Sequence, residues 1–216
     1  MSEYADLLYE VDSNIATITL NRPDRLNAIS QPMLLSFSKA LRDAPPIVLH
    51  RIDTPTICAL NGGAAGYGMD LALGCDIRIA SEHAKMGAVF AKRGVLPESG
   101  GCWYLPRLLG WARAAEVAFL GDVLDARRSL ELGLVNRVVP HDDLMAESMK
   151  IARQIANNAP LSVQSTKRMM RLGQDETFEA AVDHIYLQLL PLFQSEDFKE
   201  GLSAFAERRE PVFKGR

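Results

Sequence analysis

The stretch that decides the fold runs from Asn61 to Asp76 and reads NGGAAGYGMDLALGCD. It follows an apolar run, residues 55–60, that is typical of a short buried strand, and it continues into an apolar segment suited to a helix. Glycines stand at positions 62, 63, 66 and 68 between the two. A strand, a glycine-rich turn and a helix start place bare backbone N–H groups at a positive helix end. The stretch therefore predicts a site for a negative oxygen, either a phosphate or an oxyanion formed during a reaction.

Two common phosphate cradles fit this stretch poorly. A P-loop needs a Gly-Lys pair, but neither lysine nor arginine occurs between Arg51 and Arg78. A dinucleotide fingerprint needs a third glycine, which is absent after Gly66 and Gly68. Asp70, in the first turn of the expected helix, would repel a phosphate but could move protons beside a transient enolate. The alternative interpretation of Asp70 is an ordinary acid at a helix N-terminus.

These residues resemble the crotonase superfamily, also called the enoyl-CoA hydratase/isomerase family. The similarity covers nearly the whole chain in the family's order, and the succession of motifs is far more specific than any one of them. The matching segments are residues 15–29, 53–71, 75–80, 94–101, 126–140 and 200–205.

The resemblance implies an α/β fold with two parts. Residues 1–157 are expected to form a crotonase-like ββα spiral core. Residues 158–216 are expected to form a helical C-terminal region that serves trimerisation, so the expected assembly is a homotrimer or a hexamer made of two trimers. The sequence itself supports this division, because four helical stretches after residue 142 follow a mixed α/β part.

The resemblance also assigns site residues by position. The oxyanion hole is expected to use the backbone N–H groups of Tyr67 and Gly66, and the catalytic side chains are expected to be Glu98 and Asp70. The residues expected to contact the substrate or its CoA part are Arg25, Leu26, Ala28, Gly63, Ala65, Gly68 and Phe90.

Phe90 stands where the family's hydratases carry their second glutamate, and it cannot move a proton. Glu98, after Pro97, matches the place where several isomerases of the family carry their acid. The resemblance therefore favours enoyl-CoA isomerase-like double-bond migration over hydration. Hydration or another crotonase-type lyase or hydrolase reaction is the first alternative, and a catalytically impaired CoA-binding homologue is the second. Glu98 as a simple helix-capping acid is the non-catalytic interpretation.

One part of the family pattern is absent. After Ala44, family members run through a strand, a first oxyanion turn and a further helix, but here Pro45 follows at once. A few tens of residues are missing, together with the second N–H donor. Either the protein has lost this segment, or the sequence omits residues that the protein contains. The intact mass decides, because 23.8 kDa corresponds to the deletion.

The composition limits which kinds of partner and cofactor are expected. A net charge of −3 gives no reason to expect nucleic acid or an anionic membrane. Cys58, Cys75 and Cys102 lack zinc-site spacing and are expected to be buried, reduced thiols in the cytoplasm. No metal and no separate cofactor is expected, since CoA enters as part of the substrate. The first residues lack the features of an export signal, and no apolar run approaches the length needed to cross a bilayer.

The pattern along the chain predicts several elements. Residues 8–20 are expected to form a hairpin around Ser13 and Asn14, and residues 31–42 a helix capped by Ser30. Further strands are expected at 76–80, 85–87 and 135–139. Further helices are expected at 69–73, 103–109, 112–120, 125–133, 142–157, 160–172, 176–190 and 197–209.

Overall fold

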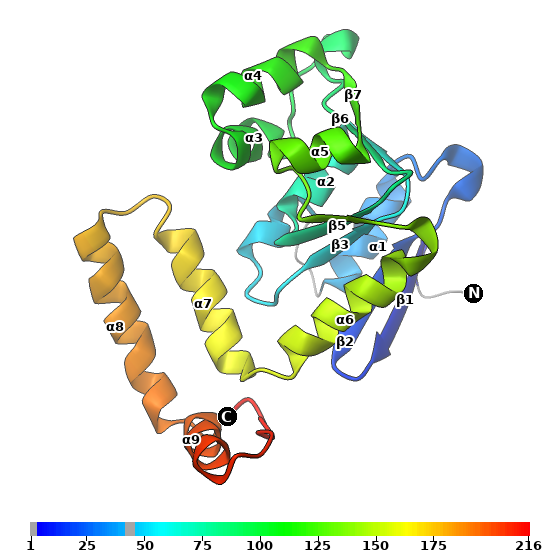
Figure 1. Ribbon diagram of the computed structural model, residues 1–216. Helices are drawn as coiled ribbons and strands as arrows, with labels where there is room; N and C mark the ends of the chain where they lie inside the picture. Colours follow the sequence, from blue (N-terminus) through cyan, green and yellow to red (C-terminus); the bar gives the residue numbers. More distant parts are fainter. Residues whose placement is uncertain (1–3, 42–45) are drawn as a thin grey trace. The chain divides into compact units, whose positions relative to one another are not determined.

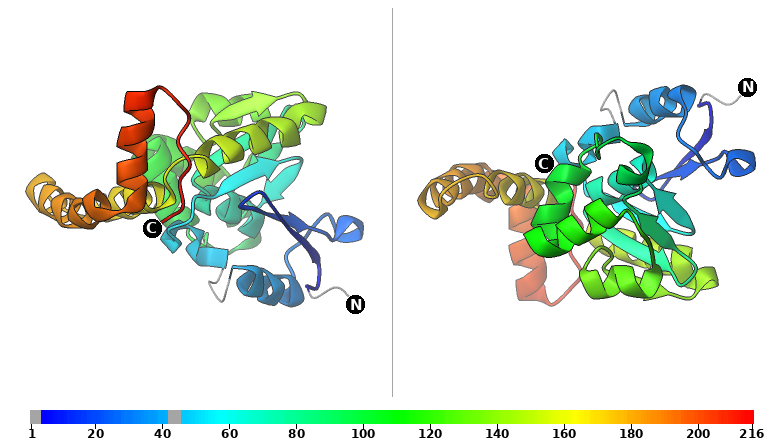
Figure 2. Two further views of the ribbon diagram at one scale, coloured as in Figure 1. Left: turned by 90° about the horizontal axis from the view of Figure 1, so that it is seen from below. Right: turned by 90° about the horizontal axis from the view of Figure 1, so that it is seen from above.

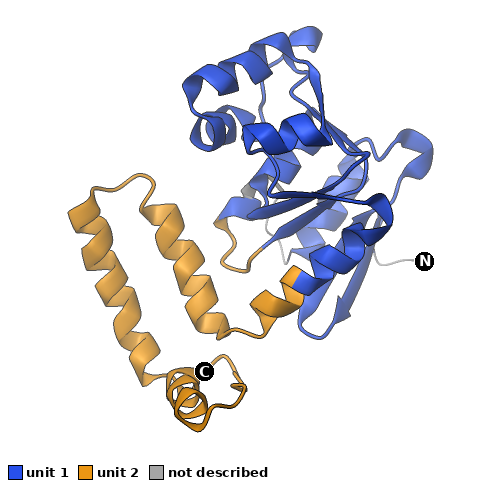
Figure 3. Cartoon of the chain, in the orientation of Figure 1, with its two compact units in different colours: residues 1–50, 56–150 blue, residues 51–55, 151–216 orange. Residues whose placement is uncertain are grey.

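The computed structural model describes residues 4–41 and 46–216. The chain divides into two compact units, residues 1–50 with 56–150 and residues 51–55 with 151–216 (Figure 3). The division falls inside a helix, close to the expected boundary after residue 157. The segment predicted to be missing after Ala44 lies outside the described residues, and so does the end of the helix expected over 31–42.

Among the described residues, the strands are β1 (Leu7–Asp12), β2 (Ile15–Leu20), β3 (Ile57–Leu60), β4 (Gly63–Ala65), β5 (Ile77–Ser81), β6 (Lys85–Gly87), β7 (Val123–Asp125) and β8 (Arg137–Val139). The first unit has the helices α1 (Gln31–Ala40), α2 (Tyr67–Gly74), α3 (Gly101–Leu109), α4 (Trp111–Leu120) and α5 (Ala126–Leu132). Short 3-10 turns are η1 (Pro23–Arg25), η2 (Pro46–Arg51), η3 (Ala91–Arg93) and η4 (His141–Asp143).

The N-terminal part of the first unit is a hairpin with one helix against it. β1 and β2 pair antiparallel, and both turn residues, Ser13 and Asn14, have positive φ, as a tight two-residue hairpin turn requires. The Ser30 hydroxyl caps α1 by accepting the N–H of Met33 at 3.1 Å. α1 then packs on the hairpin (Figure 2). The predicted hairpin and capped helix are both confirmed.

Two small sheets carry the glycine-rich stretch. One is parallel, in the order β3-β5-β8, and its central strand β5 is almost entirely buried. The other has the order β4-β6-β7, with β4 and β6 parallel and β6 and β7 antiparallel. β4 leads directly into α2, so Gly66 lies at the junction of a strand and a helix. The predicted strand–turn–helix is confirmed, with an extra strand inside the expected turn.

The core of the first unit gathers side chains from the helices around α2. α2 contributes Met69 and Leu73, α3 contributes Leu105, and α4 and α5 contribute Val117 and Leu132. Each large apolar side chain buried in this way stabilises the fold by about 1.5–3 kcal/mol. α5 packs on β6, β7 and β8 (Figure 1), and α2 packs on α3 and β4.

The second unit is helical. α6 (Leu144–Ala156) crosses the division between the units, and α7 (Pro160–Leu172), α8 (Phe178–Gln194) and α9 (Glu196–Glu207) follow. The chain end folds back on α9, because buried Asp197 accepts the N–H groups of Lys214 at 2.6 Å and Gly215 at 2.8 Å. The mixed core with a helical C-terminal region is the fold that the sequence predicts.

Candidate active site

The turn before α2 is fixed by Gly66. Gly66 has φ 57° and ψ −125°, a conformation that residues with a Cβ rarely adopt. Its N–H donates to the Gly87 carbonyl at 3.0 Å, which ties the helix start to β6. This corrects the prediction that the Gly66 N–H is one of the oxyanion donors, because the strand ladder already uses it.

The next two amides are open. In the part of the chain that the structure describes, the N–H groups of Tyr67 and Gly68 donate to no carbonyl and no side chain. The first N–H groups of a helix have no partner within the helix and carry its positive end. The Tyr67 amide is therefore an open donor at the positive end of α2, and its role as an oxyanion donor stays a prediction.

Asp70 is almost completely enclosed, with 2% of its surface exposed. Its Oδ2 accepts the N–H of Ser99 at 3.2 Å, and the N–H of Gly101 also donates to the carboxylate. Burial raises its pKa from the ordinary value of 3.8 to about 6. The two backbone hydrogen bonds oppose that rise in pKa, and the charge of Glu98 adds to it.

Glu98 is exposed and lies on the loop between η3 and α3. Its charge acts on both Tyr67 and Asp70, so the loop brings it to the first turn of α2. The preceding Val95 and Leu96 are exposed at 58% and 64%. Glu98 thus faces solvent, and two exposed apolar residues precede it in the loop.

Phe90 is buried at 5% exposure and packs beside the glycine turn. A Cβ added to Gly66 would lie 3.9 Å from the Phe90 ring. The structure thus brings together Tyr67, Asp70, Glu98 and Phe90, and a single side-chain carboxylate of this cluster, that of Glu98, is open to a ligand.

The expected CoA contacts fall into two places. Gly63 and Ala65 are exposed on β4, next to the glycine turn. Gly68 lies close to Ala64, because a Cβ added to Gly68 would be 3.9 Å from the Cβ of Ala64. Apart from Phe90, described above, the remaining contacts are exposed on the turn that includes η1: Arg25, Leu26 and Ala28.

The η1 turn has an unusual backbone. Leu26 is left-handed, with φ 52°, and 93% exposed, and the following Asn27 also has positive φ. The Asn27 side chain holds the turn by accepting the N–H of Arg22 at 2.6 Å. An exposed leucine kept in a strained conformation is typical of a binding turn. In the described residues, no hydrogen bond or ion pair joins this turn to α2.

Three residues of the site have roles that were not predicted. Gly87 accepts the Gly66 N–H, and Ser99 and Gly101 donate to Asp70. The signal for Gly101 was present, because two glycines follow Ser99 in the loop. A side chain at Gly101 would overlap the Asp70 carboxylate and lie 2.8 Å from Pro97 Cβ.

The structure also tests the prediction that the cysteines are buried. Cys102 is exposed, against the expectation of a buried thiol, because it lies on the outer side of α3 while Tyr104 and Leu105 face the core.

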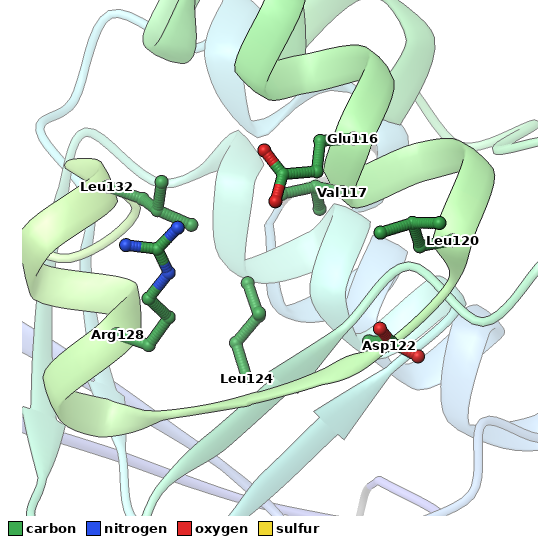
Figure 4. A pocket seen from close by; sticks show the side chains of 7 residues that line it. All are labelled: Glu116, Val117, Leu120, Asp122, Leu124, Arg128 and Leu132. Atoms are coloured by element: carbon green, nitrogen blue, oxygen red, sulfur yellow. The ribbon is translucent and has the colours of Figure 1, made fainter.

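A small cavity of about 50 Å³ lies between α4, β7 and α5 (Figure 4). Glu116, Val117, Leu120, Asp122, Leu124, Arg128 and Leu132 line it. It shares no residue with the site above and is far smaller than ordinary ligand pockets.

Metal sites and membrane spans were searched over residues 4–41 and 46–216. No group of three or more His, Cys, Asp or Glu side chains is placed to hold a metal ion. Within the same residues, every helix is too short or too polar to cross a membrane.

Comparison with known proteins defines the class. The sequence matches the enoyl-CoA hydratase/isomerase family over residues 47–216. The chain therefore belongs to this family, within the crotonase superfamily.

Two curated relatives and two solved structures illustrate the match. (E)-Benzylidenesuccinyl-CoA hydratase of Thauera aromatica is 41% identical over 176 residues, 81% of this chain and 69% of that protein. 1,2-Epoxyphenylacetyl-CoA isomerase of Escherichia coli (strain K12) is 31% identical, covering 97% of this chain and 98% of that protein. Enoyl-CoA hydratase from Bacillus anthracis superposes with TM-score 0.94 at 27% identity, covering 98% of this chain and all of that one. An enoyl-CoA hydratase subunit from Geobacillus kaustophilus superposes with a TM-score of 0.91 at 31% sequence identity, and both chains are covered completely.

The comparison also bears on the missing segment. The alignment with the Escherichia coli isomerase runs over 260 positions, although this chain has 216 residues. Some positions of that relative therefore have no counterpart in this sequence.

Proposed function

We propose that this protein is an acyl-CoA enzyme that moves a double bond from C3 to C2 of a 3-enoyl-CoA. Glu98 removes a proton from C2, and the electrons of that C–H bond pass into the thioester as a dienolate. Glu98 then returns the proton at C4 while the C3=C4 double bond shifts to C2=C3. Atoms and electrons balance without any oxidant, metal or separate cofactor, and CoA takes part only as a portion of the substrate.

The observation that carries this proposal is the single open carboxylate, that of Glu98, beside the first turn of α2. Glu98 lies within electrostatic reach of Tyr67 and Asp70, and buried Phe90 fills the side of the glycine turn. One carboxylate is sufficient for a proton shuttle, whereas two are needed to position and activate water. The Tyr67 N–H, which has no acceptor among the described residues, supplies the donor for the enolate oxygen.

The substrate is held, in this proposal, by two exposed turns. The thioester lies beside strand β4 and the first turn of α2. β4 contributes Gly63 and Ala65, and the first turn of α2 contributes Gly68. The left-handed turn with Leu26 and its neighbours Arg25 and Ala28 takes up the CoA part, and Arg25 supplies a positive charge for its phosphates.

Hydration is the second candidate. It is favoured by the relative from Thauera aromatica, which is a hydratase and is 41% identical to this chain. In that case Glu98 activates water in place of the second glutamate that Phe90 replaces. A CoA-binding homologue without turnover is the remaining alternative, supported by the segment that is absent after Ala44.

Two substrates separate these functions. The purified protein is incubated with 3-hexenoyl-CoA and with crotonyl-CoA, and the products are identified by mass spectrometry and proton NMR. We expect 2-hexenoyl-CoA from the first substrate and little water addition to the second. Faster hydration of crotonyl-CoA than isomerisation would favour the hydratase, and binding of both without conversion would favour the impaired homologue. The intact mass of the same sample establishes whether the chain is 23.8 kDa or longer.

The second unit supports the proposed assembly. None of the residues of α8, all of which the structure describes, is buried, and its exposed side chains include Tyr186, Leu187 and Leu190. α9 adds Leu202 and Phe205, exposed at 57% and 86%. Apolar surface of this extent marks a contact with another protein. We therefore propose a homotrimer, or a hexamer of two trimers, in the cytoplasm.

A further inference from the structure

Asp70 holds the loop that carries Glu98. Its buried carboxylate accepts the Ser99 N–H at 3.2 Å and also the N–H of Gly101. Both donors follow Glu98 directly in the chain, so one side chain of α2 fixes the backbone on which Glu98 stands. Hydrogen bonds to an ionised carboxylate are about twice as strong as those between neutral groups.

The fit between Asp70 and this loop is close. A Cβ at Gly101 would overlap Asp70 Oδ1 and would lie 2.8 Å from the Cβ of Pro97. Gly100, between the two donors, has φ 111°, which residues with a side chain rarely adopt. The two glycines therefore allow the loop backbone to reach the carboxylate.

Tyr67 holds the same loop from a second direction. Its phenol shares a hydrogen bond with the hydroxyl of Ser99, a residue only 4% exposed. Two side chains from the first turn of α2 thus contact Ser99, one through its backbone and one through its hydroxyl. Glu98 remains exposed beside them.

We propose that Asp70 is a positioning residue, which holds residues 99–101 by two backbone hydrogen bonds and so places Glu98 over the start of α2. This rests on the proposed function, and it replaces the expectation that Asp70 itself assists in proton transfer. The carboxylate is 2% exposed and is occupied by the loop amides, so it does not face a ligand.

The protonation state of Asp70 gives the proposal a pH signature. Its pKa is raised to about 6, mainly by burial. Among the described residues, the titratable groups that act on it are Glu98 in the loop and Tyr67 on its own helix. Above pH 6 the ionised carboxylate holds both amides, and below pH 6 the protonated form holds them more weakly.

The first test is Asp70→Asn, assayed with 3-hexenoyl-CoA from pH 5 to 8. We expect kcat to fall roughly 10- to 100-fold, as small misplacements of a catalytic group do, while KM changes less than about twofold. The fall of kcat below about pH 6 that we expect for the wild type should disappear in this variant. A loss of activity as complete as that of Glu98→Gln, or a limb near pH 6 that persists in the variant, would overturn the proposal.

A second variant alters the same loop without replacing either carboxylate. Gly101→Ala pushes the backbone away from Asp70 and should also lower kcat with little change in KM. Wild-type kcat in this variant would overturn the proposal. Asp197→Asn is the matched control, because it too removes a buried carboxylate that accepts two backbone N–H groups, and its kcat should equal that of the wild type.

Amide hydrogen exchange tests the positioning role independently of turnover. Asp70→Asn should lower the protection of the Ser99 and Gly101 amides at least about tenfold at pH 7.5, while Leu109 at the end of α3 keeps its protection. Unchanged protection at Ser99 and Gly101 would overturn the proposal. If the wild type converts no enoyl-CoA, the proposed function fails, and this measurement still decides whether Asp70 holds the loop.

Discussion

The N–H of Gly66 donates to the carbonyl of Gly87 at 3.0 Å and fixes the start of α2 to strand β6. The hydrogen bond has two consequences. It removes Gly66 from the set of oxyanion donors, and it sets the direction of the next amide, that of Tyr67. The position of the proposed oxyanion donor thus depends on a strand contact rather than on a loop.

Gly66→Ala should cost both stability and activity. Gly66 has φ 57°, and a residue with a Cβ in such a conformation pays on the order of 1–3 kcal/mol. We expect that loss of unfolding free energy in urea titrations and a lower kcat, because the Tyr67 amide shifts. Gly62→Ala is the control, since a Cβ there meets nothing within 4 Å and its φ is not positive. Equal stability of the two variants would contradict the assigned role of Gly66.

Glu98→Gln should abolish isomerisation while leaving the fold intact. General acid–base groups contribute roughly 10²- to 10⁴-fold to the rate, and an amide of nearly the same size at this exposed position should leave the packing unchanged. The measurement is kcat for 3-hexenoyl-CoA, with thermal unfolding to check the fold. Wild-type kcat in this variant would remove Glu98 from the mechanism.

The free energy of unfolding should depend on pH because of Asp70. Its pKa in the folded protein is raised from 3.8 to about 6, so the folded state binds this proton more readily than the unfolded state. The stability that results is complete at low pH and is lost as the pH rises through about 6. Thermal unfolding at pH 5 and pH 7.5 checks this. Between these pH values the wild type should lose stability that Asp70→Asn does not lose. The Tm of the variant minus the Tm of the wild type should therefore be larger at pH 7.5 than at pH 5, by about 2 °C or more. A difference that shrinks with rising pH would contradict it.

The exposed face of α8 should mediate assembly. Leu190 is 57% exposed in the single chain, and a charge placed there would be buried in an interface at high cost. We expect Leu190→Asp to elute as a monomer where the wild type has three or six times 23.8 kDa by light scattering. Val11→Asp, on the exposed edge of the hairpin, should assemble normally. A monomeric wild type would refute the proposed trimer.

The sequence predicts most of the fold because its local signals agree with the packing. Ser30 is followed by Pro32 in the first turn of α1, and Gly133 ends α5 in a left-handed conformation. The strands β4 and β7 were not predicted. β4 consists of a glycine and two alanines, which carry no strand propensity, and its pairing with β6 supplies what the local sequence lacks.

The candidate site was predicted less completely. Motifs placed Tyr67, Asp70, Glu98 and Phe90, and the structure brings these four together. What no motif reveals is which amide is already used and which carboxylate is enclosed. The loss of the Gly66 donor and the burial of Asp70 both arise from contacts between segments distant in sequence, Gly66 with Gly87 and Asp70 with Ser99.

The central claim is that the Tyr67 amide and Glu98 act on the same thioester. A crystal structure with a bound, unreactive 3-enoyl-CoA analogue tests it most directly. We expect the thioester oxygen about 2.7–3.2 Å from the Tyr67 nitrogen, with the Glu98 carboxylate next to C2. A thioester bound away from both residues would contradict the account.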